Sequence, residues 1–173
     1  MTRPSEQDVA AFLQLKKSLV RVMEWTNRPS VKSPQWKQFE SRCYLGSSIS
    51  DEANFKAHYR PKGTRIRGES TIEIPEAFYV SIWIREHRVL AIDTLDGQIH
   101  KNKNIDGRPY SGMTISAATH VHLWTMMGDG YVEPIEPPLV KLEEIVTAFC
   151  ERANLWLNGA VKHPLYGQSM ELL

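Results

Sequence analysis

The sequence predicts an α+β protein in which an antiparallel β-sheet is flanked by an N-terminal and a C-terminal amphipathic helix. Apolar residues recur at helical spacing near both ends of the chain, and short segments of alternating polarity lie between them. Because the helices bracket the strands instead of alternating with them, neighbouring strands are expected to pair in an antiparallel sheet. No repeat or linker divides the chain, so residues 1–173 are expected to form a single domain.

The first helix is predicted from its start signal and its apolar stripe. Ser5 is a good N-cap, and Asp8 follows at the spacing of a capping box. The helix should end before Asn27-Arg28-Pro29, where a polar loop begins. The residues of the stripe recur at threes and fours: Val9, Phe12, Leu15, Leu19 and Val22.

The central part of the chain reads as strands over residues 38–45, 55–60, 77–85, 88–93 and 119–125. In the third of these, Phe78, Val80 and Ile82 share one face of the strand. In the last, His120 and His122 project together, because strand residues two apart point the same way.

The second helix is predicted near the C-terminus and should pack on the same face of the sheet as the first. Pro137 and Pro138 suit its first turn, and Asn158-Gly159 should end it. A broad apolar stripe runs through residues 142–157 and includes Cys150.

Composition excludes several classes of protein. With a net charge of +1, the protein has neither the strongly basic surface that binds nucleic acid nor the strongly acidic surface of a DNA mimic. No apolar run approaches the ~20 residues of a membrane span, and no secretory signal opens the chain, so a cytoplasmic protein is expected. Cys43 and Cys150 are far apart and are expected to be reduced thiols. Walker A, G-x-G-x-x-G, G-x-S-x-G and H-E-x-x-H motifs do not occur.

Groups that titrate near neutral pH, or that ligate metals, gather between Asp93 and Trp124. His120 and His122 could share one metal ion or grip one phosphate, and a metal would need further ligands, for which His100 and Asp93 are candidates. A His-x-His pair on a strand invites comparison with cupins, but Met126 and Met127 stand where those proteins place a glutamate. We therefore predict no metal and no cofactor. The alternative to a functional role is that these histidines hydrogen-bond to neighbours on a half-exposed strand face.

A basic run offers a second candidate surface. It could contact a phosphate backbone, or it could be a solvated strand edge protected by cations. The run consists of Lys56, His58, Arg60, Lys62, Arg65 and Arg67.

The Asp-Gly pairs at Asp96 and Asp106 fit turns better than a calcium loop, because the EF-hand spacing is absent.

The series Asp93…Gly97-x-x-His100-x-Asn102…Asp106-Gly107…His120-x-His122-x-Trp124 resembles a family of small bacterial and prophage proteins of unknown function. The resemblance covers residues 55–137. It implies a setting of phage or mobile-element conflict, such as a toxin–antitoxin pair or a host-defence complex, and it implies no catalytic assignment. The chain departs from that pattern at Lys103 and Asn104, where a proline is expected before Asp106-Gly107, which puts the geometry of this loop in question.

Two functions from different classes are compatible with the sequence. The first, which we predict, is a non-enzymatic binding or inhibitory protein that acts on a protein partner, a defence complex or a cognate toxin or antitoxin. It would present an aromatic surface of Trp83, Trp124 and Tyr131. We prefer it because local spacing assembles no complete catalytic set.

The alternative is a toxin-type ribonuclease or phosphodiesterase that needs no metal. Two of its histidines would act as general base and general acid, and cations would stabilise the phosphate. In either case nucleic-acid affinity is expected to be weak and salt-dependent. The catalytic candidates are His100, His120 and His122, and the phosphate-binding candidates are Lys56, His58, Arg60, Arg88 and Lys101.

Overall fold

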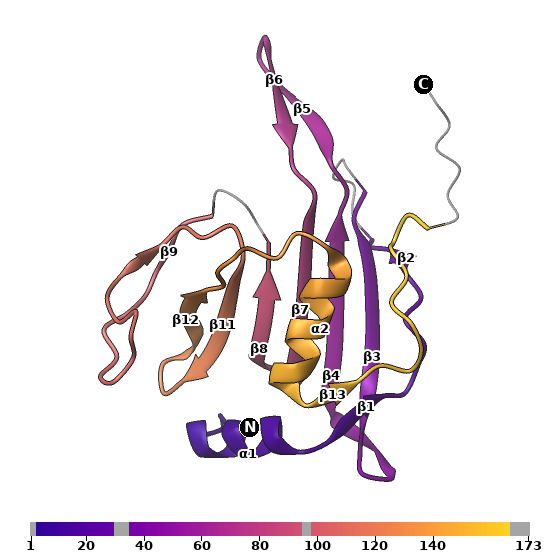
Figure 1. Cartoon of the computed structure of the whole chain (residues 1–173), viewed down its shortest axis with the longest axis vertical. Coiled ribbons are helices and arrows are strands. Elements are labelled where there is room, and N and C mark those ends of the chain that lie inside the picture. Colours follow the sequence, from indigo (N-terminus) through magenta and orange to yellow (C-terminus); the bar gives the residue numbers. More distant parts are fainter. Residues whose placement is uncertain (1–2, 30–34, 95–97, 167–173) are drawn as a thin grey trace.

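The computed structural model describes residues 3–29, 35–94 and 98–166. Of these residues 46% lie in strands and 13% in two helices, so the protein is mostly β. One large sheet has the order β12-β11-β8-β7-β4-β3-β1-β13 and curls into a half-barrel (Figure 1). The predicted fold, a sheet flanked by two amphipathic helices, is therefore wrong.

The strands that form the large sheet are antiparallel to their neighbours, except that β1 and β13 pair in parallel. Two hairpins, β5–β6 and β9–β10, lie outside it. In chain order the strands are β1 (Lys17–Leu19), β2 (Thr26–Asn27), β3 (Lys37–Leu45), β4 (Ser48–Arg60), β5 (Gly63–Arg67), β6 (Ser70–Ile74), β7 (Ala77–Ile84), β8 (His87–Asp93), β9 (His100–Lys101), β10 (Thr114–Ile115), β11 (His120–Thr125), β12 (Gly128–Pro134) and β13 (Leu155–Trp156).

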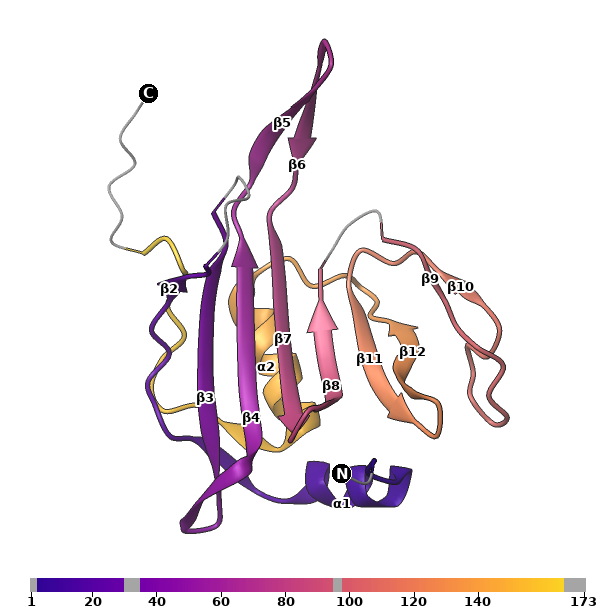
Figure 2. The same cartoon turned by 180° about the vertical axis from the view of Figure 1, so that it is seen from behind.

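The two helices occupy different places. Helix α2 (Leu142–Ala153) packs on one face of the sheet over β7 and β8, whereas α1 (Glu6–Gln14) lies across the ends of the strands (Figures 1 and 2). Neither of these described helices has the length and apolar character needed to cross a membrane.

Both helices are shorter than predicted because strands take over part of each apolar stripe. Helix α1 stops at Leu15, whose backbone is extended, and Leu19 is buried in β1 opposite Cys43. Val22, which the stripe would bury, is 47% exposed. Helix α2 ends at Asn154 in a left-handed conformation, and the next two residues form β13.

The predicted strands correspond to β3, the second half of β4, β7, β8 and β11. Their alternation gives the sheet one apolar face, and α2 covers it: Phe55 packs edge-on against Phe149 of the helix at 5.7 Å between ring centroids. Residues directly opposite one another on neighbouring strands share a face. Phe55 pairs with Ile82, and Val80 pairs with Ile92, so these residues all line the covered face.

The other face, seen in Figure 2, lies on the side of the sheet away from α2. A single row of direct partners crosses it from β4 to β11, and it consists of His58, Tyr79, Asp93 and His120. We call this face the outer face. The row brings together groups that lie up to 62 positions apart in the sequence.

A buried lysine joins α1 to the sheet. Lys17 is 1% exposed, and its Nζ donates hydrogen bonds to the carbonyls of Phe12 and Leu15 at 2.6 Å and of Leu13 at 3.3 Å. These carbonyls lie in the last turn of α1 and at its cap, where a helix lacks N–H donors of its own for some of its acceptors. Burial lowers the pKa of this ammonium group to about 8.

Replacing Lys17 with Met should lower the free energy of unfolding by about 2–4 kcal/mol, because the carbonyls at the end of α1 lose their donor. Urea denaturation measures this change. Lys16→Met is the matched control, since Lys16 is exposed and lies over the Trp156 ring. Equal losses in the two variants would contradict the role assigned to Lys17.

Candidate metal centre

The histidines of the outer face converge on Asp93. His120 of β11 lies directly opposite Asp93 of β8, and His122 lies opposite Ala91 on the same side of the sheet. Asp93 is 3% exposed, His120 0% and His122 5%. Two imidazoles and a carboxylate are thus held inside the protein by strand pairing alone.

The third imidazole arrives from the β9–β10 hairpin, which folds against β12. Asn102 fastens this segment: its side-chain amide donates to the carbonyls of Tyr110 at 2.9 Å and Val132 at 2.8 Å, and it accepts from the Val132 backbone N–H at 2.8 Å. This places the His100 ring 4.5 Å from His120 and 5.0 Å from His122, between ring centroids.

One ring nitrogen from each of His100, His120 and His122 lies within 4.8 Å of the others. We call these three residues the histidine cluster. In a tetrahedral zinc site neighbouring nitrogen ligands are about 3.3 Å apart. Side-chain movements on the order of 1 Å would therefore bring the cluster to ligand spacing.

Asp93 contacts two members of the cluster in different ways. The Nε2 of His122 lies 3.0 Å from Oδ2 and makes a hydrogen bond. The Nε2 of His120 lies 2.7 Å from Oδ1, but the two groups are not aligned for a hydrogen bond. Oδ1 of Asp93 and the Nε2 atoms of His100 and His120 are thus buried polar atoms without a hydrogen-bond partner among the described residues. Such atoms are costly and rare.

The neighbours of the rings select their tautomers. Nδ1 of His120 lies 3.3 Å from the carbonyl of Ala117, which can only accept, so this nitrogen carries a proton and a neutral ring presents a lone pair at Nε2. Nδ1 of His122 instead faces the guanidinium of Arg88 at 3.4 Å. Arg88 also donates to Asp129 at 3.0 Å and to the Tyr79 hydroxyl at 2.7 Å.

These surroundings shift the ionisation of the site. Burial alone would raise the pKa of Asp93, but the close contacts and charge of His120 and His122 more than offset it and hold that pKa well below its usual range. Burial lowers the pKa of His100, and the nearby His120 and His122 lower it further. An ionised carboxylate and a neutral imidazole are the forms that bind cations.

The remaining predicted phosphate-binding residues lie in two places. Lys56, His58 and Arg60 project from β4 on the outer face, and Arg88 stands between them and the histidine cluster. Lys101 is exposed on β9. Arg65 and Arg67, the end of the basic run, are exposed on the β5–β6 hairpin, which projects beyond the sheet (Figure 2).

The three aromatic residues predicted to face a protein partner do not form one exposed surface. Trp124 is 8% exposed, and its Nε1 donates to the carbonyl of Pro4. Tyr131 is 1% exposed, and its hydroxyl accepts from the Tyr110 backbone N–H. Trp83 alone is partly accessible, on the outer face of β7.

Sequence reasoning did not assign functional positions to Tyr79, Asn102 and Asp129. Tyr79 and Asp129 hold Arg88, and Asn102 holds the segment that carries His100. Tyr79 could have been found from its place on the polar side of a well-predicted strand. The partners of Asn102 and Asp129 depend on contacts between distant segments.

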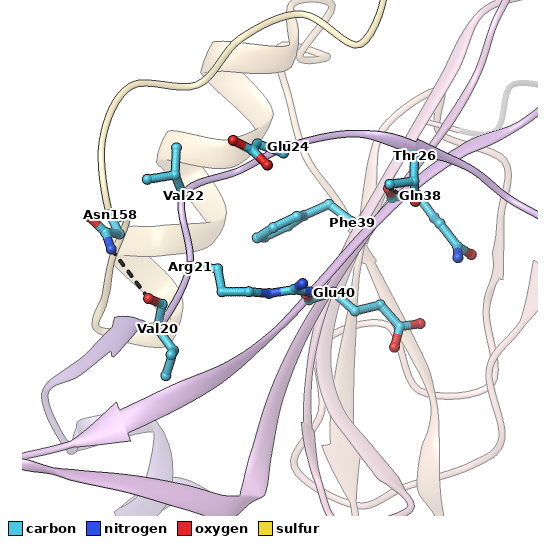
Figure 3. Close-up of a pocket in the computed structure, with 9 residues that line it drawn as sticks. All are labelled: Val20, Arg21, Val22, Glu24, Thr26, Gln38, Phe39, Glu40 and Asn158. Carbon is cyan, nitrogen blue, oxygen red and sulfur yellow. Dashed lines mark hydrogen bonds between the residues drawn. The ribbon is translucent and has the colours of Figure 1, made fainter.

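A cavity of about 540 Å³ lies far from the histidine cluster, near β1 and β3 toward the other edge of the sheet (Figure 3). Asn158 closes one side with a hydrogen bond of 3.4 Å to the Val20 carbonyl. Arg21 reaches across to the carbonyl of Glu40. No histidine or cysteine among the described residues lines this cavity, so it offers none of the chemistry of the histidine cluster.

The pKa of His58, on the same row, predicts a pH effect on stability. Burial first, and repulsion from Arg28 second, lower that pKa to about 4, whereas an unfolded histidine has a pKa of about 6.5. Between these values the unfolded chain binds a proton that the folded chain does not, so His58 reduces stability as the pH falls through this window. In His58→Gln the urea midpoint should fall less between pH 7 and about 4.5 than in the wild type. His163→Gln is the control. If the urea midpoint of His163→Gln fell by as little as that of His58→Gln, the assignment of the pH effect to His58 would be refuted.

Comparisons of the chain with protein-family models, with curated proteins and with solved structures find no match in any of the three. The resemblance to small bacterial and prophage proteins therefore stays a prediction.

Proposed function

We propose that this protein binds a divalent transition-metal ion at the histidine cluster, with Asp93 as a further donor. The observation that carries the proposal is that buried polar atoms of His100, His120 and Asp93 make no hydrogen bond with the described residues, at a point where three imidazoles converge. A cation at this point would satisfy all of these atoms together. This departs from our sequence prediction, which assigned no metal.

The donor chemistry narrows the class of ion. Imidazole nitrogens with one carboxylate suit Zn²⁺, Ni²⁺ and Fe²⁺, whereas Mg²⁺ and Ca²⁺ prefer oxygen ligands. Neither thiol belongs to the cluster, because Cys43 is in β3 and Cys150 is on α2. Ions that depend on thiolate ligands are therefore disfavoured.

Each member of the cluster would take a definite part. His100 offers an Nε2 that makes no hydrogen bond with the described residues, and His120 offers an Nε2 that lies 2.7 Å from Oδ1 of Asp93. His122 would exchange its hydrogen bond to Asp93 for the ion and bind it as a neutral imidazole, and a proton is released only from a ring that was doubly protonated before binding. Arg88, which faces the other nitrogen of His122, is already paired with Asp129, so much of its charge is balanced.

Burial separates this proposal from the metal-independent ribonuclease. A general base or acid must come within hydrogen-bond reach of the substrate. His120 is 0% exposed and His122 is 5% exposed, which favours contact with a small ion over contact with an RNA phosphate. The protein-partner function remains a prediction, and the burial of Trp124 and Tyr131 removes its structural support.

The proposal is tested by thermal unfolding of the untagged protein after dialysis against EDTA. At about 100 times its Kd, Zn²⁺ should stabilise the fold by about 2.7 kcal/mol and raise Tm by about 5–10 °C, and Mg²⁺ at the same concentration should not. Isothermal titration should give one ion per chain, with proton release that varies with the buffer.

His120→Asn should abolish the Zn²⁺ effect, and so should His100→Asn, which changes a half-exposed position and leaves the core intact. His58→Asn is the matched control and should respond as the wild type does. No Zn²⁺-dependent shift in the wild type, or an undiminished shift in both cluster variants, would eliminate the metal site.

Asn102→Ala should weaken Zn²⁺ binding about 10–100-fold although Asn102 does not touch the cluster, because the segment that carries His100 loses its attachment to β12. Titration gives the Kd, and circular dichroism confirms the sheet. Asn104→Ala, at an exposed position of the same segment, is the control. An unchanged Kd in Asn102→Ala would show that His100 is held by other contacts.

A further inference from the structure

A second site lies on the outer face beside the histidine cluster. It is a cavity of about 250 Å³ that opens between the β2–β3 region and β7. We call it the aromatic pocket, and it is lined by Arg28, Trp36, His58, Ala77, Phe78, Tyr79 and Trp83.

The walls of the pocket are flat rings. His58 and Tyr79 stack at 5.6 Å between centroids with an interplanar angle of 19°. Trp36 and Trp83 also line the pocket and are partly exposed. Aromatic walls of this kind favour a planar ring system as ligand, because stacked rings gain energy beyond their buried area.

Cations surround the same rings. The guanidinium groups of Arg28 and Arg60 lie 5.7 and 5.9 Å from the Trp36 ring, and Lys56 Nζ lies 5.0 Å from the Trp83 ring. Within the described residues neither arginine has a carboxylate within 4.0 Å, and Lys56 lies 3.7 Å from Glu40. The pocket therefore combines surfaces for a planar ring with positive charge that is not neutralised, which matches a ligand with a flat ring and an anionic group.

We infer that the aromatic pocket binds a nucleoside monophosphate unit, with the base among the rings and the phosphate at Arg28 and Arg60. Base–aromatic stacking and arginine contacts to phosphate are the recurrent means of binding single nucleotides and single strands. The cavity is smaller than most ligand sites and suits one base. The inference does not depend on the metal site.

The pocket and the cluster share the outer face. His58, Tyr79, Asp93 and His120 are successive partners across four strands, so the pocket end of the row lies about 14 Å from the cluster end. The Tyr79 hydroxyl, which contacts Arg88, links the two. If the bound nucleotide belongs to a single-stranded nucleic acid, the nucleotides on one side of it would therefore extend over the histidine cluster, and those on the other side would extend away from it.

Binding can be measured by quenching of tryptophan fluorescence in EDTA, with AMP and UMP as probes. Both should bind saturably, and ribose 5-phosphate and adenosine should each bind about tenfold more weakly, because each lacks one half of the recognised unit. A single-stranded hexanucleotide identifies the source of the unit. Affinity about tenfold above that of AMP indicates a nucleotide within a strand, and equal affinity indicates a free nucleotide.

Arg28→Gln and Trp83→Leu should each lower the affinity for AMP about tenfold. Arg42→Gln is the control, because Arg42 is an exposed arginine of β3 that pairs with Asp51. Absence of saturable binding up to about 10 mM AMP would overturn the inference. So would equal affinities in the wild type and both pocket variants.

His120→Asn separates the two sites. This variant should lose the Zn²⁺ response and keep its affinity for AMP in EDTA. Loss of AMP binding in His120→Asn, with the fold intact by circular dichroism, would mean that the phosphate binds at the cluster, and the pocket assignment would be wrong.

Discussion

Both candidate sites depend on strand register across the middle of the sheet. Because Tyr79 pairs with both His58 and Asp93, and Asp93 pairs with His120, a shift of one residue in any of these pairings would turn a whole strand over. The same shift would expose the apolar face that α2 covers. Burial of that face therefore also fixes the alignment of the polar residues on the outer face.

The strands could be predicted from the sequence because their signal is local. Alternation along residues 77–85 is enough to indicate both a strand and its two faces. The helices were overextended because apolar residues at threes and fours do not distinguish a helix from a helix followed by a short strand. Leu19 continues the stripe of α1 by spacing, yet it is buried by pairing with Cys43. Tertiary pairing overrides periodicity at such places.

The candidate site likewise has a part that the local sequence predicts and a part that depends on contacts between distant segments. That His120 and His122 share a face follows from the strand period, whereas Asp93 joins them only through the pairing of β8 with β11. The position of His100 depends on Asn102 and Val132, which are 30 residues apart. Trp124 and Tyr131 were assigned to the surface because large aromatic residues are common at interfaces. The contacts that bury them, with Pro4 and Tyr110, cannot be seen in the local sequence.

Charge balance makes Asp93 the centre of the site. A carboxylate that is 3% exposed costs several kcal/mol unless a positive charge or a full set of donors compensates it. Arg88 is nearby but is engaged by Asp129, so much of its charge is already balanced. The missing charge can come from one proton on the histidine cluster or from one metal ion. These two compete for the same nitrogen atoms, so a metal ion that binds here must displace protons, and its affinity must fall as the pH is lowered. If the cluster served only to stabilise the fold, its contribution to stability would instead be largest at low pH, where a protonated imidazole balances the charge of Asp93.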